Sequence, residues 1–168
     1  MGSSREYGLP PILGKDPAVL ILGSFPSKMS LERQQYYANP RNQFWKIMSD
    51  LLTSGILEDI PSFSDLLKDH HIAVWDVIAS RSYHQGSMDR DIMDPLLNDI
   101  PCFIRNHSSL RYVGMNGGTA WLFFERSLRD ISLDRTIVRE RLPSTSPAYA
   151  SCSYHQKLLR WQNLLKYL

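Results

Sequence analysis

The sequence predicts an α/β fold, a three-layer α/β/α sandwich around a central, mostly parallel sheet of four strands. Short apolar segments of strand length alternate with segments of helical periodicity, which is the pattern of βαβ units. Residues 18–22 (Ala-Val-Leu-Ile-Leu) are apolar at every position, as in a strand that is buried on both faces. The chain has 168 residues, 43% of them hydrophobic, which predicts one globular domain over 1–168.

Four strands are predicted from such runs. They span residues 18–22, 72–75, 110–115 and 135–141. The last run alternates between apolar and polar side chains, which favours an edge strand. Residues 80–89, which follow the second run, show no periodicity and are predicted to form a functional loop.

Helical periodicity lies between and after these strands. Residues 44–52 place apolar side chains at i, i+3, i+4, i+7 and i+8. Two further helices are predicted from similarly spaced residues, which are Trp121, Phe124 and Leu128 in one and Leu158, Trp161, Leu165 and Leu168 in the other. Right-handed crossovers place such helices on both faces of a parallel sheet, and ligands bind outside the carboxyl ends of its strands.

Composition and charge narrow the function classes. No apolar run approaches the roughly 18 residues that cross a bilayer, and the first ten residues lack a signal-peptide core, so we expect a cytoplasmic protein without a membrane partner. We also expect a monomer. Residues 1–100 carry a net charge of −4 and residues 101–168 a net charge of +6. The basic second part suits an anionic partner, although solvated arginines on ordinary helices would give the same count.

The sequence contains no recognisable motif for binding a metal ion or a nucleotide cofactor. The two cysteines, Cys102 and Cys152, are too few for a four-thiolate zinc site, and we expect both to be buried thiols. The turn at 23–27 (Gly-Ser-Phe-Pro-Ser) lacks the glycine spacing of dinucleotide folds and the Gly-Lys-Ser/Thr of a P-loop. We therefore expect no cofactor and no metal.

Five segments carry a resemblance to a known family. They are residues 23–27 (GSFPS), 36–45 (YYANPRNQFW), 74–77 (VWDV), 116–118 (NGG) and 142–148 (LPSTSPA). In order and spacing they resemble the uracil-DNA glycosylase superfamily, and most closely its hypoxanthine-DNA glycosylase branch. The resemblance implies a repair enzyme whose partner is DNA that contains a deaminated base. Such an enzyme flips the base out and hydrolyses its N-glycosidic bond without a metal.

The resemblance also implies which residue positions the attacking water. Members of the superfamily usually have a polar residue in the first turn, where this chain has Phe25. In the hypoxanthine branch the role passes to an asparagine that maps onto Asn42. Asn39 is the rival, because it stands where relatives commonly have histidine. Asn42 is also a plausible N-cap for a helix that begins at Gln43, so one asparagine could cap while the other acts.

Base binding is implied for the first turn and two further residues. These are Gly23, Ser24, Phe25, Tyr37 and Asp76. Tyr37 matches the aromatic residue that stacks on the flipped base, and its alternative role is that of a core or rim aromatic. Asp76 follows a strand, where a carboxylate would accept from hypoxanthine N1–H and repel the N1 acceptor of adenine. Its alternative role is a cap or a salt-bridge partner.

Contact with the DNA backbone is expected from residues of the late basic part and from two turns. The candidates are Ser27, Asn116, Gly117, Gly118, Arg139, Arg141, Ser144, Thr145 and Ser146. Glycines before a helix let backbone N–H groups approach a phosphate, and arginines beside a hydroxyl-rich loop favour DNA contact. Each of these features also occurs in ordinary turns.

Two rival functions belong to other classes. A Ser–His hydrolase would need a nucleophile elbow of the G-x-S-x-G type, which the chain lacks. A non-catalytic nucleic-acid or nucleotide-binding module would keep the phosphate loops but has no fixed need for Asn42 or Asp76. The presence of both favours the enzyme.

Overall fold

A four-stranded parallel sheet forms the centre of the computed structural model, which describes residues 4–53, 60–83, 92–133 and 136–168. Its order is β3-β2-β6-β7. The strands are β2 (Val19–Gly23), β3 (Ile72–Asp76), β6 (Tyr112–Asn116) and β7 (Val138–Leu142). All four predicted strands are therefore present, with ends that differ from the prediction by at most three residues, and β7 is the predicted edge strand.

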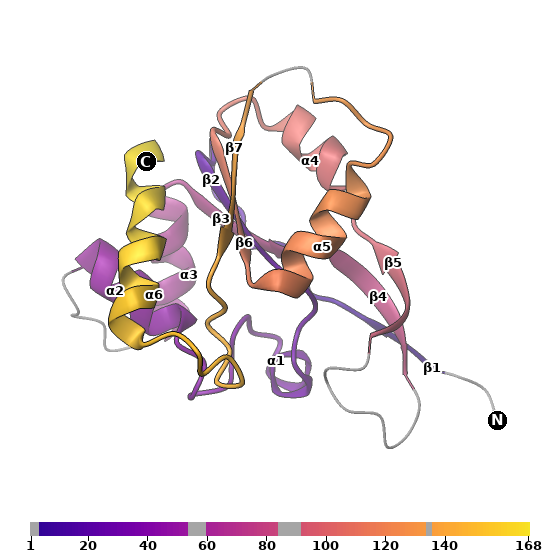
Figure 1. The fold of residues 1–168 in the computed structure, drawn as a ribbon, viewed down its shortest axis with the longest axis horizontal. Coiled ribbons are helices and arrows are strands. Elements are labelled where there is room, and N and C mark those ends of the chain that lie inside the picture. The colour runs from indigo at the N-terminus through magenta and orange to yellow at the C-terminus, as the bar shows by residue number, and fades with distance from the viewer. Residues whose placement is uncertain (1–3, 54–59, 84–91, 134–135) are drawn as a thin grey trace.

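Helices cover both faces of this sheet, which confirms the three-layer architecture (Figure 1). On one face lie α2 (Phe44–Thr53), α3 (Ile60–Asp69) and α6 (Tyr154–Trp161). On the other lie α4 (Ile100–Asn106) and α5 (Gly118–Ser127). Strand β2 alternates between the layers, because Val19 and Ile21 belong to the first core cluster and Leu20 and Leu22 to the second.

Local sequence accounts for several helix ends. The short helix α1 (Lys28–Arg33) begins after Ser27, whose Oγ accepts from the Ser30 N–H. Helix α6 begins with a capping box between Ser153 and Gln156. The apolar spacing predicts a C-terminal helix that reaches Leu168, but the α-helix ends at Trp161. The chain continues as the 3-10 helix η1 (Gln162–Tyr167).

A second sheet was not predicted. It is antiparallel, in the order β1-β4-β5, and consists of β1 (Ser4–Tyr7), β4 (Ile78–Tyr83) and β5 (Met93–Leu97). The prediction of a loop over 80–89 is therefore wrong for 80–83, and 84–89 lie outside the described residues. The strand forms because β1 and β5 supply hydrogen-bond partners far apart in sequence, which a local pattern does not reveal.

The structure also describes the two cysteines and the length of the helices. Cys102 and Cys152 are free thiols, but both are half-buried, so the expectation of fully buried thiols is wrong. Cys102 lies in the first turn of α4 and Cys152 in the loop before α6, near the surface in both cases. Within the described ranges, no helix is long and apolar enough to cross a membrane.

Candidate active site

Three candidate site residues end neighbouring strands of the parallel sheet. Gly23, Asp76 and Asn116 are the last residues of β2, β3 and β6. Gly23 lies directly opposite Asp76 in the β2–β3 register, so parallel pairing brings them to the same edge. The five motifs are separated by up to about a hundred residues, yet three of them meet here because all carboxyl ends of a parallel sheet point the same way.

The buried carboxylate of Asp76 and the buried hydroxyl of the half-buried Tyr37 face the glycine at this edge. Asp76 is 3% exposed, and its Oδ2 has no hydrogen-bond partner among the described residues, nor does the Tyr37 hydroxyl. A Cβ on Gly23 would overlap the Asp76 carboxylate and approach the Tyr37 hydroxyl to 3.1 Å. Only glycine therefore leaves room for both groups. Buried polar atoms without partners are rare in proteins and often mark ligand sites.

Burial also changes the ionisation of these two groups. Desolvation raises the pKa of the Asp76 carboxyl to about 7, because the charged form loses its hydration. Desolvation likewise raises the pKa of Tyr37, the neighbouring Asp76 carboxylate adds to this effect, and the nearby Asn116 side chain opposes it in part, although it lies outside hydrogen-bond geometry with the Tyr37 hydroxyl. Around neutral pH, Asp76 can therefore exchange a proton while Tyr37 stays a neutral hydroxyl.

Tyr37 is fixed by the start of helix α2. Its ring stacks on Phe44 with centroids 4.1 Å apart and planes 25° apart. Its backbone has a φ of 53°, in the left-handed region that costs free energy for a residue with a side chain. A base that stacks on Tyr37 must use the ring face opposite Phe44.

Both candidate water-positioning asparagines support local turns. The Asn42 side-chain oxygen accepts from the Phe44 N–H at 3.0 Å, and the Asn39 oxygen accepts from the Arg41 N–H at 2.9 Å. The helix begins at Phe44 and not at Gln43, so Asn42 stands one residue before the N-cap position, and its bond to the Phe44 N–H is an Asx turn and not the predicted cap. One oxygen lone pair of Asn42 remains for another partner. Asn42 is half-buried, and the phenyl ring of its bonding partner Phe44 is the one that stacks on Tyr37.

The turn after β2 packs against the second sheet. The carbonyls of Gly23 and Ser24 accept from the N–H groups of Val77 and Ile78 at 2.9 and 3.0 Å. The Phe25 ring lies under the Arg81 guanidinium, 4.7 Å from its centroid. This contact holds the apolar residue in place at the position where a polar one was expected from the resemblance.

The loop after β7 is bonded to the end of β6. The Asn116 amide donates to the Thr145 hydroxyl and its oxygen accepts from the Thr145 N–H, each at 2.9 Å. Thr145, one of the predicted DNA-binding residues, is fully buried in this structure. Its two hydrogen bonds to Asn116 fix the loop. Ser144 and Ser146 each accept a backbone N–H two residues on, at 3.2 Å, which stabilises tight turns.

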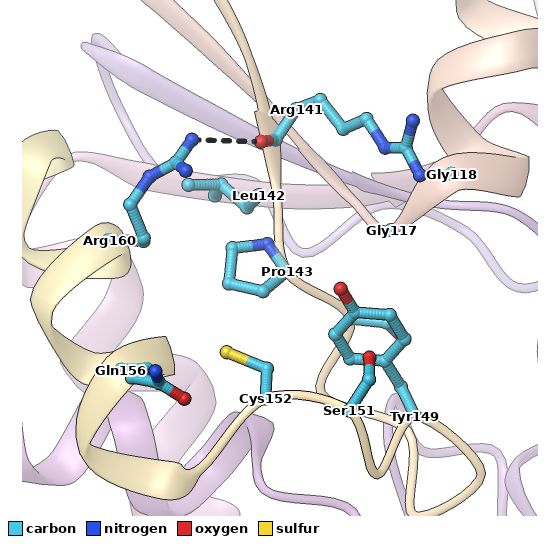
Figure 2. Close-up of a pocket in the computed structure, with 11 residues that line it drawn as sticks. Gly117, Gly118, Arg141, Leu142, Pro143, Tyr149, Ser151, Cys152, Gln156 and Arg160 are labelled. Carbon is cyan, nitrogen blue, oxygen red and sulfur yellow. Dashed lines mark hydrogen bonds between the residues drawn. The ribbon is translucent and has the colours of Figure 1, made fainter.

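A cleft of about 630 Å³ opens beside this loop (Figure 2). Its lining includes Gly117, Gly118, Arg141 and Ser144 from the predicted DNA-binding set. Gly117 has a φ of 96°, which favours glycine, and it precedes the first turn of α5. A Cβ on Gly118 would lie 2.7 Å from the Arg141 guanidinium. A cation and the N-terminus of a helix therefore adjoin, which suits a phosphate.

Arg139 and Ser27 lie outside this cleft lining. Arg139 is two residues before Arg141 on β7, and its guanidinium lies 3.8 Å from the Glu125 carboxylate. Ser27 uses its hydroxyl to cap α1. The structure thus brings Arg141 to the cleft but commits Arg139 to an ion pair, with each partner 45% exposed.

Sequence reasoning missed half of the cleft. The additional lining residues are Tyr149, Ser151, Cys152, Gln156 and Arg160. Arg160 donates to the Glu140 carboxylate at 3.2 Å and to the Arg141 carbonyl at 3.5 Å, and so joins α6 to β7 (Figure 2). The sequence signal that could have indicated these α6 residues is the polar face of the helix, which lies opposite its apolar residues and is exposed. Within the described ranges, no group of three His, Cys, Asp or Glu side chains could hold a metal ion.

Comparison with known proteins gives the class of this fold and site. The Uracil DNA glycosylase superfamily matches residues 10–166, and the chain belongs to this family. It is 34% identical over 145 residues to a protein of Methanosarcina acetivorans named hypoxanthine DNA glycosylase, covering 85% of this chain and 87% of the relative. A protein of the same name from Methanosarcina barkeri is 33% identical over 118 residues, covering 67% and 72%.

A solved structure shares the fold over almost the full length of both chains. It is a solution NMR structure from Methanosarcina acetivorans, named as a candidate uracil DNA glycosylase. Its TM-score is 0.80 at 30% identity, covering 97% of this chain and 98% of the other. The fold class predicted from the sequence is therefore confirmed.

The buried Asp76 makes a testable contribution to stability against pH. The pKa of its carboxyl is about 7 in the folded protein against an ordinary 3.8, so the folded state binds the proton more tightly than the unfolded chain. The stability that this proton contributes is therefore lost as pH rises through 7. We expect Asp76→Asn to become more stable than the wild type between pH 4 and 8, by up to about 4 kcal/mol. Urea unfolding at pH 4, 6 and 8 measures this difference. Asp65→Asn, at an exposed site, is the control, and equal pH dependence in all three proteins would contradict the assignment.

Proposed function

We propose that this chain is a DNA glycosylase that hydrolyses the N-glycosidic bond of a deaminated base flipped out of DNA. Hypoxanthine is the first candidate substrate, with uracil and xanthine as further ones. The observation that carries the proposal is the pair of unpartnered polar atoms, Asp76 Oδ2 and the Tyr37 hydroxyl, buried beside Gly23. The family of the chain and the names of its two relatives support the same reaction class.

Asp76 is proposed to recognise the edge of the base. An ionised carboxylate accepts hydrogen bonds only, so it matches hypoxanthine N1–H or uracil N3–H and opposes the N1 acceptor of adenine. Because its pKa is about 7, the Asp76 carboxyl is partly protonated and partly ionised near neutral pH. A base N–H that donates to it favours the ionised form. Because Oδ2 is shielded from solvent, the base reaches it after a covering side chain shifts.

Asn42 is proposed to hold the attacking water. The bond from C1′ to the base nitrogen breaks first, its electron pair leaves with the base, and an oxocarbenium-like sugar remains for the water to attack. The free lone pair of the Asn42 oxygen can accept a hydrogen bond from one water O–H and so direct the water oxygen at C1′. The proton that the water loses on attack neutralises the departing base anion through solvent. Its bond from the Phe44 N–H fixes the direction of the amide.

The cleft beside Gly117 is proposed to hold the DNA backbone. Arg141 and the N-terminus of α5 supply positive charge and N–H groups at one point, and Arg160 lines the other wall. Phosphate contacts of this kind position a duplex without reading its sequence. A non-catalytic binding module would use the same cleft, but it gives no reason to bury an unpaired carboxylate at the sheet edge.

Release of free base tests the reaction directly. We expect the protein to release hypoxanthine from oligonucleotides that carry deoxyinosine, and to leave matched deoxyadenosine oligonucleotides intact. Parallel substrates with deoxyuridine and deoxyxanthosine measure the range of bases under single-turnover conditions. Intact oligonucleotides throughout, together with retained DNA binding, would favour the binding module.

Asn42→Ala and Asn39→Ala distinguish the two candidates for the water-positioning residue. We expect Asn42→Ala to lower the single-turnover rate by at least about a hundredfold while duplex affinity changes little, because the amide acts mainly in the transition state. Asn39→Ala should lose only the turn contact with the Arg41 N–H. The reverse order of the two rates would assign the water to Asn39.

Arg141→Gln and Arg139→Gln test the phosphate cleft with two arginines from one strand. We expect Arg141→Gln to weaken binding to all duplexes alike and to reduce the slope of log affinity against log salt by about 1, the value for one lost phosphate contact. Arg139→Gln should change the slope less, since its guanidinium already faces Glu125. A wild-type slope for Arg141→Gln would exclude Arg141 from the interface.

A further inference from the structure

Lys157 is a buried cation without an acidic partner. It lies in α6 with 2% of its surface exposed. Its ammonium donates to the Gln43 side-chain oxygen and to the Tyr149 carbonyl, each at 3.0 Å, and sits 5.4 Å from the Tyr149 ring centroid. No carboxylate of the described residues forms an ion pair with it. Both of its hydrogen-bond acceptors are neutral.

Stability alone does not explain a lysine at this position. A buried charge loses its hydration, and two neutral acceptors compensate less of that cost than a carboxylate would. The next turn of the same helix face carries Trp161, which is fully buried in the core. A methionine at 157 would continue that apolar packing without a desolvation cost.

The two acceptors of Lys157 belong to two different parts of the proposed site. Gln43 directly follows Asn42, and its own N–H donates to the Thr145 carbonyl at 3.0 Å. Tyr149 lines the cleft (Figure 2). The Lys157 ammonium therefore connects the segment that carries Asn42 to the wall of the cleft. Helix α6, which carries Lys157, is joined to both of these parts through it.

We propose that Lys157 is a positioning residue that fixes Asn42 relative to DNA bound in the cleft. This inference rests on the proposed glycosylase function. Water attack requires the water, the sugar and the backbone phosphates to be in register, and a misplacement of about 1 Å can cost a hundredfold in rate. The direct bond to Gln43 and the direct bond to Tyr149 set that register from a single atom. Lys157 itself touches neither base nor water.

Lys157→Met is the main test, since methionine is also unbranched, is only one atom shorter and removes the charge and its donors. We expect its single-turnover rate on deoxyinosine duplex to fall at least tenfold. Its Kd for a duplex with a stable abasic analogue should stay within threefold of the wild type, and its Tm within a few degrees. A rate within twofold of the wild type would overturn the proposal, as would a parallel loss of rate, affinity and Tm, which is the signature of a purely structural role.

A double-mutant cycle with Gln43→Ala tests the path of the effect. If Lys157 acts through Gln43, the double variant is no slower than the slower single variant, whereas independent effects multiply and contradict the mechanism. Gln43→Ala also serves alone if Lys157→Met does not fold, with the same tenfold fall in rate at unchanged Kd expected and an unchanged rate decisive against it. Lys166→Met, on the exposed surface of η1, is the matched control and should keep the wild-type rate.

The wild-type protein separates this inference from the proposed function. If it releases no base from any deaminated oligonucleotide, the proposed function fails and the cycle has no rate to compare. If it is active and Lys157→Met is equally fast, only the positioning role fails. Hydrogen exchange adds a readout that does not depend on activity. Loss of the bond between Lys157 and Gln43 should increase exchange at the backbone N–H of Gln43, which donates to the Thr145 carbonyl. The backbone N–H groups of β2 should stay protected.

Discussion

Burial of β2 on both faces is the constraint from which the rest of this structure follows. Every residue from Val19 to Gly23 is buried, and side chains alternate between two core clusters. A strand without a polar face needs helices above and below it, and helical crossovers in turn make its neighbours parallel. Parallel neighbours end at one edge, which is why Gly23, Asp76 and Asn116 come together.

Two buried ionisable groups, Asp76 at the end of β3 and Lys157 in helix α6, trade stability against chemistry. Asp76 and Lys157 are 3% and 2% exposed, and neither has a partner of opposite charge among the described residues. Either would be replaced by an apolar or neutral residue if stability alone determined the sequence. Unpaired groups of this kind concentrate where a protein handles a ligand or a reacting group. Asp76 ends β3 at the edge that carries Gly23, and Lys157 bonds to Gln43 next to Asn42, which agrees with that rule.

Thr145 is the residue that links the separate parts of the site. Its side chain and N–H bond to Asn116 at the end of β6, and its carbonyl accepts from the Gln43 N–H before α2. One fully buried residue thus connects the sheet edge, the loop after β7 and the start of the helix beside Asn42. In a loop rich in serine and proline, this set of bonds replaces the regular hydrogen bonding of a helix or strand.

The sequence by itself determined the parallel sheet, its edge strand and the Asn42 turn, because apolar runs, 3.6-residue spacing and Asx turns are properties of neighbouring residues. Tertiary structure decided the antiparallel sheet of β1, β4 and β5, the burial of Thr145 and the ion pair that occupies Arg139. It also decided that α6 forms one wall of the cleft. These features depend on contacts between residues far apart in the chain, and no local pattern specifies which distant partner a strand edge, a threonine or an arginine will meet.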